Sequence, residues 1–341
     1  MAIALDQAEV RIPYPELVDL LERILRKEGL SARVARILAE NCAGCERDGA
    51  HSHGVFRVAG YLSSLRSGWI NLDARPVLED AGAAFIRVDA DNGFAQPALE
   101  LAVPLLLEKT RTGGAAIVAI RDSHHFSALW PDLEPFARQG LVGLSCVTGF
   151  GCVVPHGGTK PVLGTNPICF ATPVAGEHPF VFDQATSALS NGDVRIAARE
   201  GRVLPSISGI DRGGHPTADP NAILDGGALM TFGGHKGAAI SMMVEILAAA
   251  LTGGQFSFEV DFSKNPGAET PRTGLFLLLI DPGCRSNGGF SERVAELLGR
   301  VRDSGQMRLP GERRYRQRER SLAEGVPLDR AMLEYLRSLS S

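Results

Sequence analysis

Residues 115–130 read AAIVAIRDSHHFSALW, and this stretch decides the fold class. Residues 115–123 form a short apolar run, which is typical of a buried strand. The residues before it, 96–114 (QPALELAVPLLLEKTRTGG), are typical of a helix that ends at a glycine pair. A helix that leads into a buried strand predicts an α/β protein, in which HHFSALW lies at the end of the strand.

The rest of the chain continues this pattern. Helical spacing predicts two helices within 13–47, the first ended by Gly29 and the second capped by Ser31, and a third helix from Ser52 to Gly68. Further strands are expected at 83–90, 141–149, 167–174, 179–187 and 274–280, and further helices at 233–254 and 289–303. The strands are not spaced as regular βαβ units. Neither a Rossmann G-x-G-x-x-G after a strand nor a P-loop occurs, so any nucleotide is expected to be held without them.

Composition narrows the class of protein. The chain has 341 residues, 44% hydrophobic and 22% charged, with a net charge of −4, so it has no general attraction for nucleic acid or anionic membranes. The start of the chain lacks a signal-peptide pattern, and the apolar run at 274–280 is too short to cross a bilayer. We therefore expect a cytoplasmic protein without a membrane or nucleic-acid partner.

The six cysteines include one C-x-x-C, formed by Cys42 and Cys45. Its spacing alone suits a redox pair or half of a zinc site, but no second C-x-x-C occurs and the pair lies inside a helical apolar pattern. We interpret these residues as ordinary thiols of the core or surface.

The segment RDGAHSHGVFR, residues 47–57, has the densest chemistry. If Ser52 caps the third helix, His53 lies in its first turn and Arg57 follows at i+4 on the same face. Histidine can donate a proton near neutral pH, and arginine can bind a carboxylate through two parallel hydrogen bonds. The spacing of His51 and His53 is not the i, i+4 spacing of a helical zinc pair. The alternative is that these side chains only solvate a helix start.

Two aspartates follow short strands or turns. Asp183 is placed at the end of an apolar strand, and Asp193 follows Asn191-Gly192. An aspartate can orient a histidine and stabilise its cation, although spacing alone does not bring Asp193 to His53. Both residues can equally be turn aspartates.

Other stretches suit anions or small polar ligands. Backbone N–H groups of HHFSA can meet a phosphate if a helix starts there, and GGHKGAA places Lys236 at a helix start. Thr165 and Asn166 lie in a stretch whose path glycine and proline restrict. The arginines of GERRYRQRER, residues 311–320, suit a clamp for a cofactor phosphate. Each of these stretches can also be purely structural, as a turn or a surface helix.

Taken in order, these segments resemble one family. RDGAHSHGVFR, DSHHFSALWP, VVPHGGTKPVLGTNPI, FDQATSA with GDV, GGALMTFGGHKGAAISMMVE and LPGERRYRQRE are similar to the type-2 malate/L-lactate dehydrogenases, which are NAD(P)-dependent oxidoreductases without a Rossmann fold. The similarity extends over about 11–320. HHFSALWP and GERRYRQRE most resemble the members that reduce cyclic imino acids.

The resemblance implies a function and a set of site residues. The reaction would be NADPH-dependent reduction of Δ1-piperideine-2-carboxylate to L-pipecolate and of Δ1-pyrroline-2-carboxylate to L-proline on a homodimer, with NADH as a weaker cofactor. His53 matches the proton donor, and Ser52 and Asp193 match its relay partners. The substrate contacts would be Arg57, Thr165 and Gly192. The cofactor contacts would be His125, Phe126, Ser127, Ala128, Leu129, Asp183, Gln184, Ala185, His235, Lys236, Glu312, Arg313, Arg314, Tyr315, Arg316, Gln317 and Arg318, with no metal ion.

The resemblance also implies an architecture. We expect a mixed, largely antiparallel sheet with an N-terminal helical cluster and a smaller substrate domain. The expected units are 1–70, packed with C-terminal helices; 71–120 with 270–310 on the substrate side; 121–269 for NADPH; and a basic segment, 311–341, against the cofactor.

Three other functions stay open at this point. A 2-hydroxy-acid dehydrogenase (malate, lactate or ureidoglycolate type) would use the same acid and carboxylate anchor. A metal-dependent hydrolase would use His51, His53, His124 and His125 as ligands. A nucleic-acid binder would rely on the arginines of 311–320, and it ranks last because the chain is acidic overall.

Overall fold

The structure is a computed structural model that describes residues 9–284 and 288–340. Its main element is a mixed seven-stranded sheet with the order β2-β3-β4-β12-β5-β7-β8. β3 and β4 pair in parallel and the other neighbours are antiparallel. The strands are β2 (Val77–Gly82), β3 (Phe85–Phe94), β4 (Ala115–His124), β12 (Arg272–Ile280), β5 (Val142–Val147), β7 (Ile168–Thr172) and β8 (Phe180–Gln184). This arrangement confirms the predicted non-Rossmann, largely antiparallel α/β fold.

Helices cover both faces of this sheet. α4 (Ala95–Gly113) and α5 (Trp130–Arg138) pack on one face and form the largest buried apolar cluster with the strands. α8 (His235–Glu245) and the π-helical turn η3 (Ile246–Ala250) lie on the other face, where Val244 and Ala248 meet Cys146 and Phe276. α4 ends where predicted, because Gly114 adopts the left-handed conformation at φ 88°.

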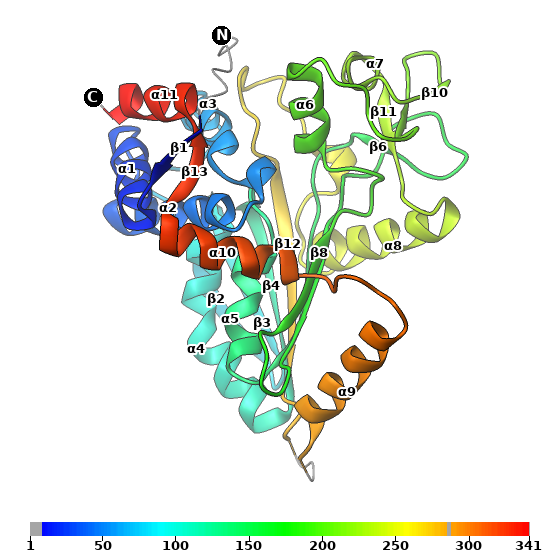
Figure 1. Cartoon of the computed structure of the whole chain (residues 1–341). Helices are drawn as coiled ribbons and strands as arrows, with labels where there is room; N and C mark the ends of the chain where they lie inside the picture. Colours follow the sequence, from blue (N-terminus) through cyan, green and yellow to red (C-terminus); the bar gives the residue numbers. More distant parts are fainter. Residues whose placement is uncertain (1–8, 285–287, 341) are drawn as a thin grey trace.

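An N-terminal helical cluster stands at one end of the sheet (Figure 1). It contains α1 (Tyr14–Lys27), α2 (Ala32–Arg47) and α3 (Val58–Arg66), packed with the C-terminal helix α11 (Arg330–Ser340). Ser31 caps α2 as predicted, since its hydroxyl accepts from the Val34 N–H at 3.3 Å. β1 (Glu9–Ile12) pairs antiparallel with β13 (Val326–Asp329), so the two ends of the described chain share one small sheet.

A second, smaller unit lies at the upper right of Figure 1, across from the helical cluster at the upper left, and we call it the small-sheet unit. Its four strands have the order β10-β9-β11-β6. The unit comprises β6 (Val153–Val154), β9 (Gly209–Ile210), β10 (Pro216–Thr217), β11 (Ala228–Met230), α6 (Asn191–Arg199) and α7 (Pro220–Leu224). Its core joins Val194 and Ala197 of α6 to Val153 and Leu229 of the strands.

The remaining helices follow β12. α9 (Phe290–Asp303) packs on Val174 and Leu309, and the basic helix α10 (Glu312–Glu324) then crosses back to the N-terminal cluster (Figure 1). Short turns η1 (His51–His53), η2 (Val55–Arg57) and η4 (Ser257–Glu259) complete the elements. Strands from the expected units 71–120 and 121–269 lie together in the one large sheet. The expected boundaries between the four units stay a prediction. Among the helices of residues 9–284 and 288–340, none is both long and apolar enough to cross a bilayer.

Candidate active site

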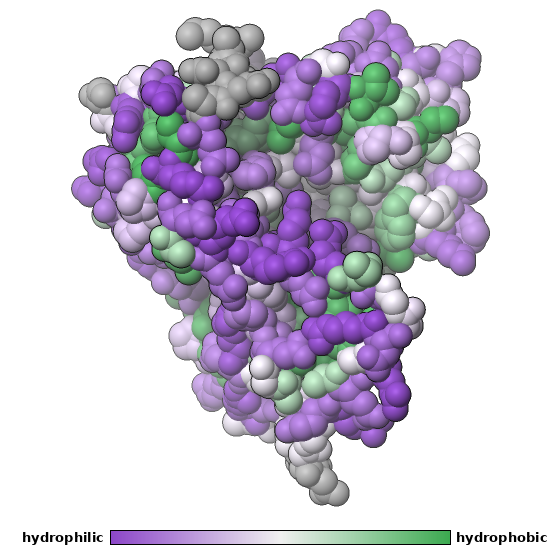
Figure 2. All heavy atoms as spheres, in the orientation of Figure 1, coloured by the Kyte–Doolittle hydropathy of each residue, from purple (hydrophilic) through white to green (hydrophobic). Residues whose placement is uncertain are grey.

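A cleft of about 1420 Å³ lies between the N-terminal helical cluster, α10, β8 and the small-sheet unit. It opens near the middle of the face in Figure 2, where hydrophilic side chains dominate the surface. Pockets for drug-sized ligands are roughly 300–1,000 Å³, so this cleft has room for a dinucleotide and a small acid together. Its lining includes residues from three predicted segments, among them His53, Asp193 and Arg314.

The turn that carries the predicted acid differs from the expected helix start. His51–His53 and Val55–Arg57 form two 3₁₀ turns, separated at Gly54, and α3 begins only at Val58. Ser52 makes no cap hydrogen bond, so its predicted role as the N-cap of the third helix is wrong. The physical reason is Glu46, whose buried carboxylate binds both ends of this turn and holds it away from a regular helix.

His53 is half-buried at the wall of the cleft. Its Nδ1 lies 3.1 Å from the Ser52 hydroxyl, the contact expected for a relay partner. Burial, and after it the charges of Arg57 and His125, lower the pKa of His53 to about 3. The resting imidazole is therefore neutral, and an added proton would make it a strong acid.

Arg57 lies directly behind this turn. Its Nε donates to the Ser52 carbonyl at 2.7 Å, and its guanidinium stacks over the Phe126 ring at 4.2 Å. A Cβ on Gly192 would lie 3.3 Å from a terminal nitrogen of Arg57 and 3.1 Å from the Ser52 Cβ, so the structure brings these three predicted residues together. Burial lowers the pKa of Arg57 to about 10, so it stays cationic at neutral pH.

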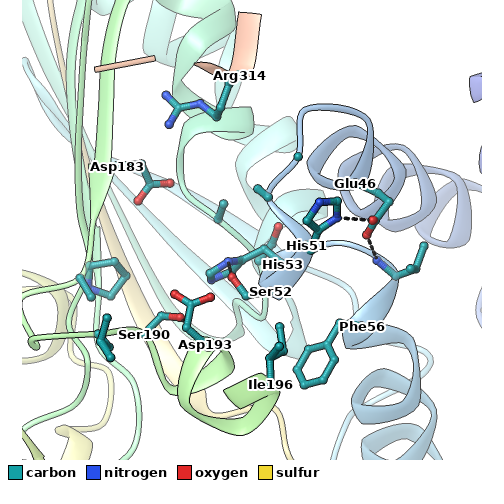
Figure 3. Close-up of a pocket in the computed structure, with 18 of the residues that line it drawn as sticks. Glu46, His51, Ser52, His53, Phe56, Asp183, Ser190, Asp193, Ile196 and Arg314 are labelled. Atoms are coloured by element: carbon teal, nitrogen blue, oxygen red, sulfur yellow. Dashed lines mark hydrogen bonds and ion pairs between the residues drawn. The ribbon is translucent and has the colours of Figure 1, made fainter. Parts of the chain in front are cut away.

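Asp193 comes from the first turn of α6. Ser190 caps this helix by accepting from the Asp193 N–H at 3.0 Å, which leaves the exposed Asp193 side chain at the cleft. Figure 3 shows it near Ser52 and His53, with its carboxylate turned toward them. The small-sheet unit thus carries Asp193, whereas the turn beside the helical cluster carries Ser52 and His53, and the two elements meet at Gly192.

A protein carboxylate occupies the first amides of α5, directly after HHFSA. α5 starts at Trp130, as that prediction required, but Asp183 accepts from the N–H groups of Leu129 and Trp130 at 2.8 and 2.9 Å. Burial raises the pKa of Asp183 even though these N–H groups oppose the shift. These two amides follow HHFSA in the chain, so a contact of the HHFSA amides themselves with a phosphate stays a prediction.

The predicted segment from His125 to Leu129 divides between cleft and interior. Ser127, Ala128 and Leu129 line the cleft. His125 is buried, and its Nε2 lies 2.7 Å from the Asp132 carboxylate. Asp132 also accepts from Asn41, and Asn41 accepts in turn from Ser127. Asp132 and Asn41 were not predicted as site residues, because neither belongs to a recognisable motif.

The predicted cofactor residues of the basic helix α10 also divide between the cleft and the interior. Arg313 and Arg314 line the cleft, and Arg314 also stacks over Trp130 and donates to the Val181 carbonyl at 3.0 Å. Arg318 instead forms buried ion pairs with Asp48 and Glu134. The other predicted members have mainly structural contacts: Tyr315 with Pro179, Gln317 with Ser321, Glu312 with Leu309, and Arg316 on a second cavity beside α9.

The remaining predicted residues also separate into two groups. Thr165, Gln184 and Ala185 line the cleft, and Asn166 is buried against Ser241 and Glu245. His235 and Lys236 are exposed at the start of α8 and are not part of the cleft lining. Within one described chain, these two residues are therefore not brought to Arg313 and Arg314.

The histidines and cysteines have separate partners. His51 pairs with Glu46, His124 with Asn92 and Thr270, and His125 with Asp132. No group of three or more His, Cys, Asp and Glu side chains within residues 9–284 and 288–340 is placed to hold a metal ion. Cys42 and Cys45 are free and buried, and burial raises the pKa of both thiols.

Comparison with known proteins places the chain in a family. Residues 12–337 match the family described as malate/L-lactate dehydrogenase. The chain belongs to this family. This finding confirms the resemblance inferred from the sequence motifs.

Relatives in the family are similar over nearly the whole chain. The chain is 60% identical over 335 residues to a Δ1-pyrroline-2-carboxylate/Δ1-piperideine-2-carboxylate reductase of Pseudomonas syringae pv. tomato, covering 98% of each chain. It is 56% identical to a protein of the same name from Pseudomonas putida, covering 97% of each. The crystal structure of Δ1-piperideine-2-carboxylate reductase from P. syringae superimposes with a TM-score of 0.95 at 60% identity, covering 97% of this chain and 99% of that one.

Proposed function

We propose that this protein is an NADPH-dependent reductase of cyclic imino acids that converts Δ1-piperideine-2-carboxylate to L-pipecolate and Δ1-pyrroline-2-carboxylate to L-proline. The observation that carries the proposal is the half-buried His53, which lines a dinucleotide-sized cleft with Arg57 directly behind its turn. The 60% identity to a reductase named for these two substrates supports the choice of substrate.

The residues of the cleft suit a nicotinamide dinucleotide. Figure 3 places Arg314 and Asp183 toward one end, and Ser52, His53 and Asp193 farther along the same cleft. Arg313 and Arg314 would bind phosphate, and the segment Ser127–Leu129 would line the cofactor path. When bound, the reduced nicotinamide supplies the hydride.

The chain's own residues bind the substrate and move the proton. Arg57 would hold the carboxylate, with Gly192 and Thr165 beside the substrate. A bound carboxylate offsets the charge of Arg57, which removes one cause of the low pKa of His53. His53 would then protonate the ring nitrogen, because a protonated imine accepts hydride at carbon more readily. General acid catalysis of this kind typically contributes roughly 10²–10⁴-fold.

Water would supply the proton: as Nε2 of His53 gives its proton to the ring nitrogen, Nδ1 would take one from the Ser52 hydroxyl, which would regain a proton from water. When the Ser52 hydroxyl donates to Nδ1 of His53, Nε2 carries the ring proton and is the atom that serves the substrate. Asp193 would complete the relay, because it faces Ser52 and His53 from the small-sheet unit (Figure 3).

The proposal includes a cytoplasmic homodimer. The exposed side of α8 and η3 presents Met242, Met243 and Ile246, an apolar stripe that a second copy of the chain would cover. Six free cysteines suit a reducing compartment. Sedimentation of the purified protein tests the dimer directly.

The function is tested by NADPH consumption with four substrates. We expect turnover with the five- and six-membered cyclic imino acids to exceed turnover with pyruvate and oxaloacetate. The two keto acids represent the alternative 2-hydroxy-acid dehydrogenase, which the family name favours. Faster turnover with oxaloacetate or pyruvate would replace the proposed function with that alternative.

A further inference from the structure

Glu46 lies beneath the turn that carries Ser52 and His53. It belongs to the last turn of α2, and the residue is only 4% exposed. One carboxylate oxygen, Oε1, lies 2.5 Å from Nδ1 of His51, and the other, Oε2, accepts from the Val55 N–H at 2.9 Å. Figure 3 shows the contact with His51 as a dashed line. One side chain therefore binds both ends of the segment that presents Ser52 and His53.

Gly54 allows the turn to approach this carboxylate closely. A Cβ on Gly54 would lie 2.0 Å from Oε2 of Glu46 and 3.0 Å from its Cα. No side chain of any size fits there, so the backbone of the turn rests directly on Glu46. The requirement for glycine comes from this close approach and not from the backbone angles, since φ of Gly54 is −87°.

A carboxylate is costly at this position. Glu46 is buried, and it lies at the C-terminal end of α2, where the helix dipole disfavours negative charge. The hydrogen bonds from His51 and Val55 offset this cost. The same pairing raises the pKa of His51, which favours a charged imidazole beside the carboxylate. The carboxylate and the turn therefore stabilise each other.

We propose that Glu46 is a positioning residue that holds the Ser52–His53 turn in its reactive geometry through these two contacts. The proposal rests on the proposed role of His53 as the proton donor. Both oxygens of Glu46 are engaged by the turn, so Glu46 acts through His53 and not on the substrate. Without this clamp the turn would move into solvent, and misplacement of a catalytic group by about 1 Å can cost about 100-fold in rate.

The test compares three variants of the full-length protein. Glu46→Ala removes both contacts, and Glu46→Gln keeps an acceptor for Val55 while removing the charge. Glu40→Ala is the matched control, because Glu40 lies on the same helix but is exposed and pairs only with Arg36 among its described ion pairs. Two quantities are measured: kcat with Δ1-piperideine-2-carboxylate and NADPH, and the pKa of His53 from NMR of labelled histidine, assigned with a His53→Asn variant.

We expect Glu46→Ala to lower kcat about 100-fold and to move the His53 pKa from about 3 toward its ordinary value of about 6.5, because burial is the main cause of the depression. Glu46→Gln should lower kcat about tenfold and shift the His53 pKa less, and Glu40→Ala should change neither quantity. A structural role alone would lower the melting temperature without changing the His53 pKa of the folded protein.

Each outcome is decisive. An unchanged His53 pKa in folded Glu46→Ala or Glu46→Gln overturns the clamp, even if kcat falls. A shifted pKa with unchanged kcat supports the clamp and instead removes His53 from the acid role. If Glu46→Ala does not fold, the isosteric Glu46→Gln variant carries the test alone.

Discussion

Two regions of this protein treat buried ionisable groups in contrasting ways. Where α10 meets α2 and α5, Arg318 binds Asp48 and Glu134, and Arg47 and Arg138 complete the pairing. In the turn beside the cleft, His53 contacts only the Ser52 hydroxyl among the described hydrogen bonds of its ring. Charges that are fully paired hold helices in place, whereas a polar group that burial keeps neutral is available for proton transfer.

Removal of the His53 imidazole should have the largest effect. We expect His53→Ala to lower kcat by roughly 10²–10⁴-fold, about 3–5 kcal/mol of barrier, while NADPH binding and the melting temperature stay close to wild type. Steady-state kinetics measure kcat, and fluorescence titration measures the binding of NADPH. An unchanged kcat would contradict the contrast between the two regions, because His53 would then have no role in proton transfer.

Removal of Arg318 should instead affect stability. Arg318→Met leaves Asp48, which is fully buried, with Arg47 as its remaining cation, so we expect a loss of about 3 kcal/mol in the free energy of unfolding. Urea denaturation at pH 7 measures this loss. The control is Arg320→Met, an exposed arginine of the same helix. A loss below about 1 kcal/mol would mean that the network contributes little to docking of α10.

Acid should destabilise the protein through its neutral histidines. The pKa of His53 is lowered to about 3 and that of buried His124 to about 4, both mainly by burial. On acidification, the two histidines therefore bind protons in the unfolded chain before they do so in the folded protein. Their full contribution to the free energy of unfolding is present above about pH 6.5 and falls as the pH is lowered. For His124, the free energy of unfolding should fall by about 1.4 kcal/mol for each pH unit.

Urea midpoints between pH 6.5 and 5 test this expectation, and His53→Asn should flatten the slope. His51 acts in the opposite sense: Glu46 raises its pKa, so its contribution is fully present below about pH 6.5 and is lost as the pH rises through the raised pKa of the folded protein. A midpoint that stays constant or rises on acidification from pH 6.5 to 5 would contradict the neutral state of the two buried rings.

The smallest expected effect concerns cofactor choice. Arg313 is exposed on the cleft side of α10, whereas Arg316 is exposed on the opposite cavity. Arg313→Glu should lower kcat/KM for NADPH about fivefold relative to NADH, if Arg313 meets the 2′-phosphate. Arg316→Glu is the matched control and should leave the ratio unchanged. Equal ratios in both variants would place the determinant of cofactor preference elsewhere.

Local patterns predicted the elements well because local interactions form them. Gly29, Ser31 and Gly114 end or cap helices where expected, and the strand at 115–124 occupies the sheet interior. The Ser52 cap was wrong because a buried carboxylate from another helix overrides the local preference.

Contacts between distant residues were beyond any local pattern. Asp183 binds the first amides of α5 from 54 positions away, and Arg318 reaches Asp48 across 270 positions. Family resemblance located the segments around the cleft, but it does not separate Arg313, which lines the cleft, from Arg318, which is an internal ion-pair partner. Glu46 had no motif of its own, and only its burial beneath Gly54 reveals it.

The pairing of β1 with β13 has a consequence for the order of folding. It joins the two ends of the described chain, and Arg11 donates to a carbonyl 314 positions later. Contacts of such long sequence separation carry a high loop-closure entropy and form late. During refolding, the large sheet should gain protection from hydrogen exchange before β1 pairs with β13. Catalytic activity should return only when this pair forms, since Pro327, Leu328 and Asp329 of β13 form part of the cleft wall.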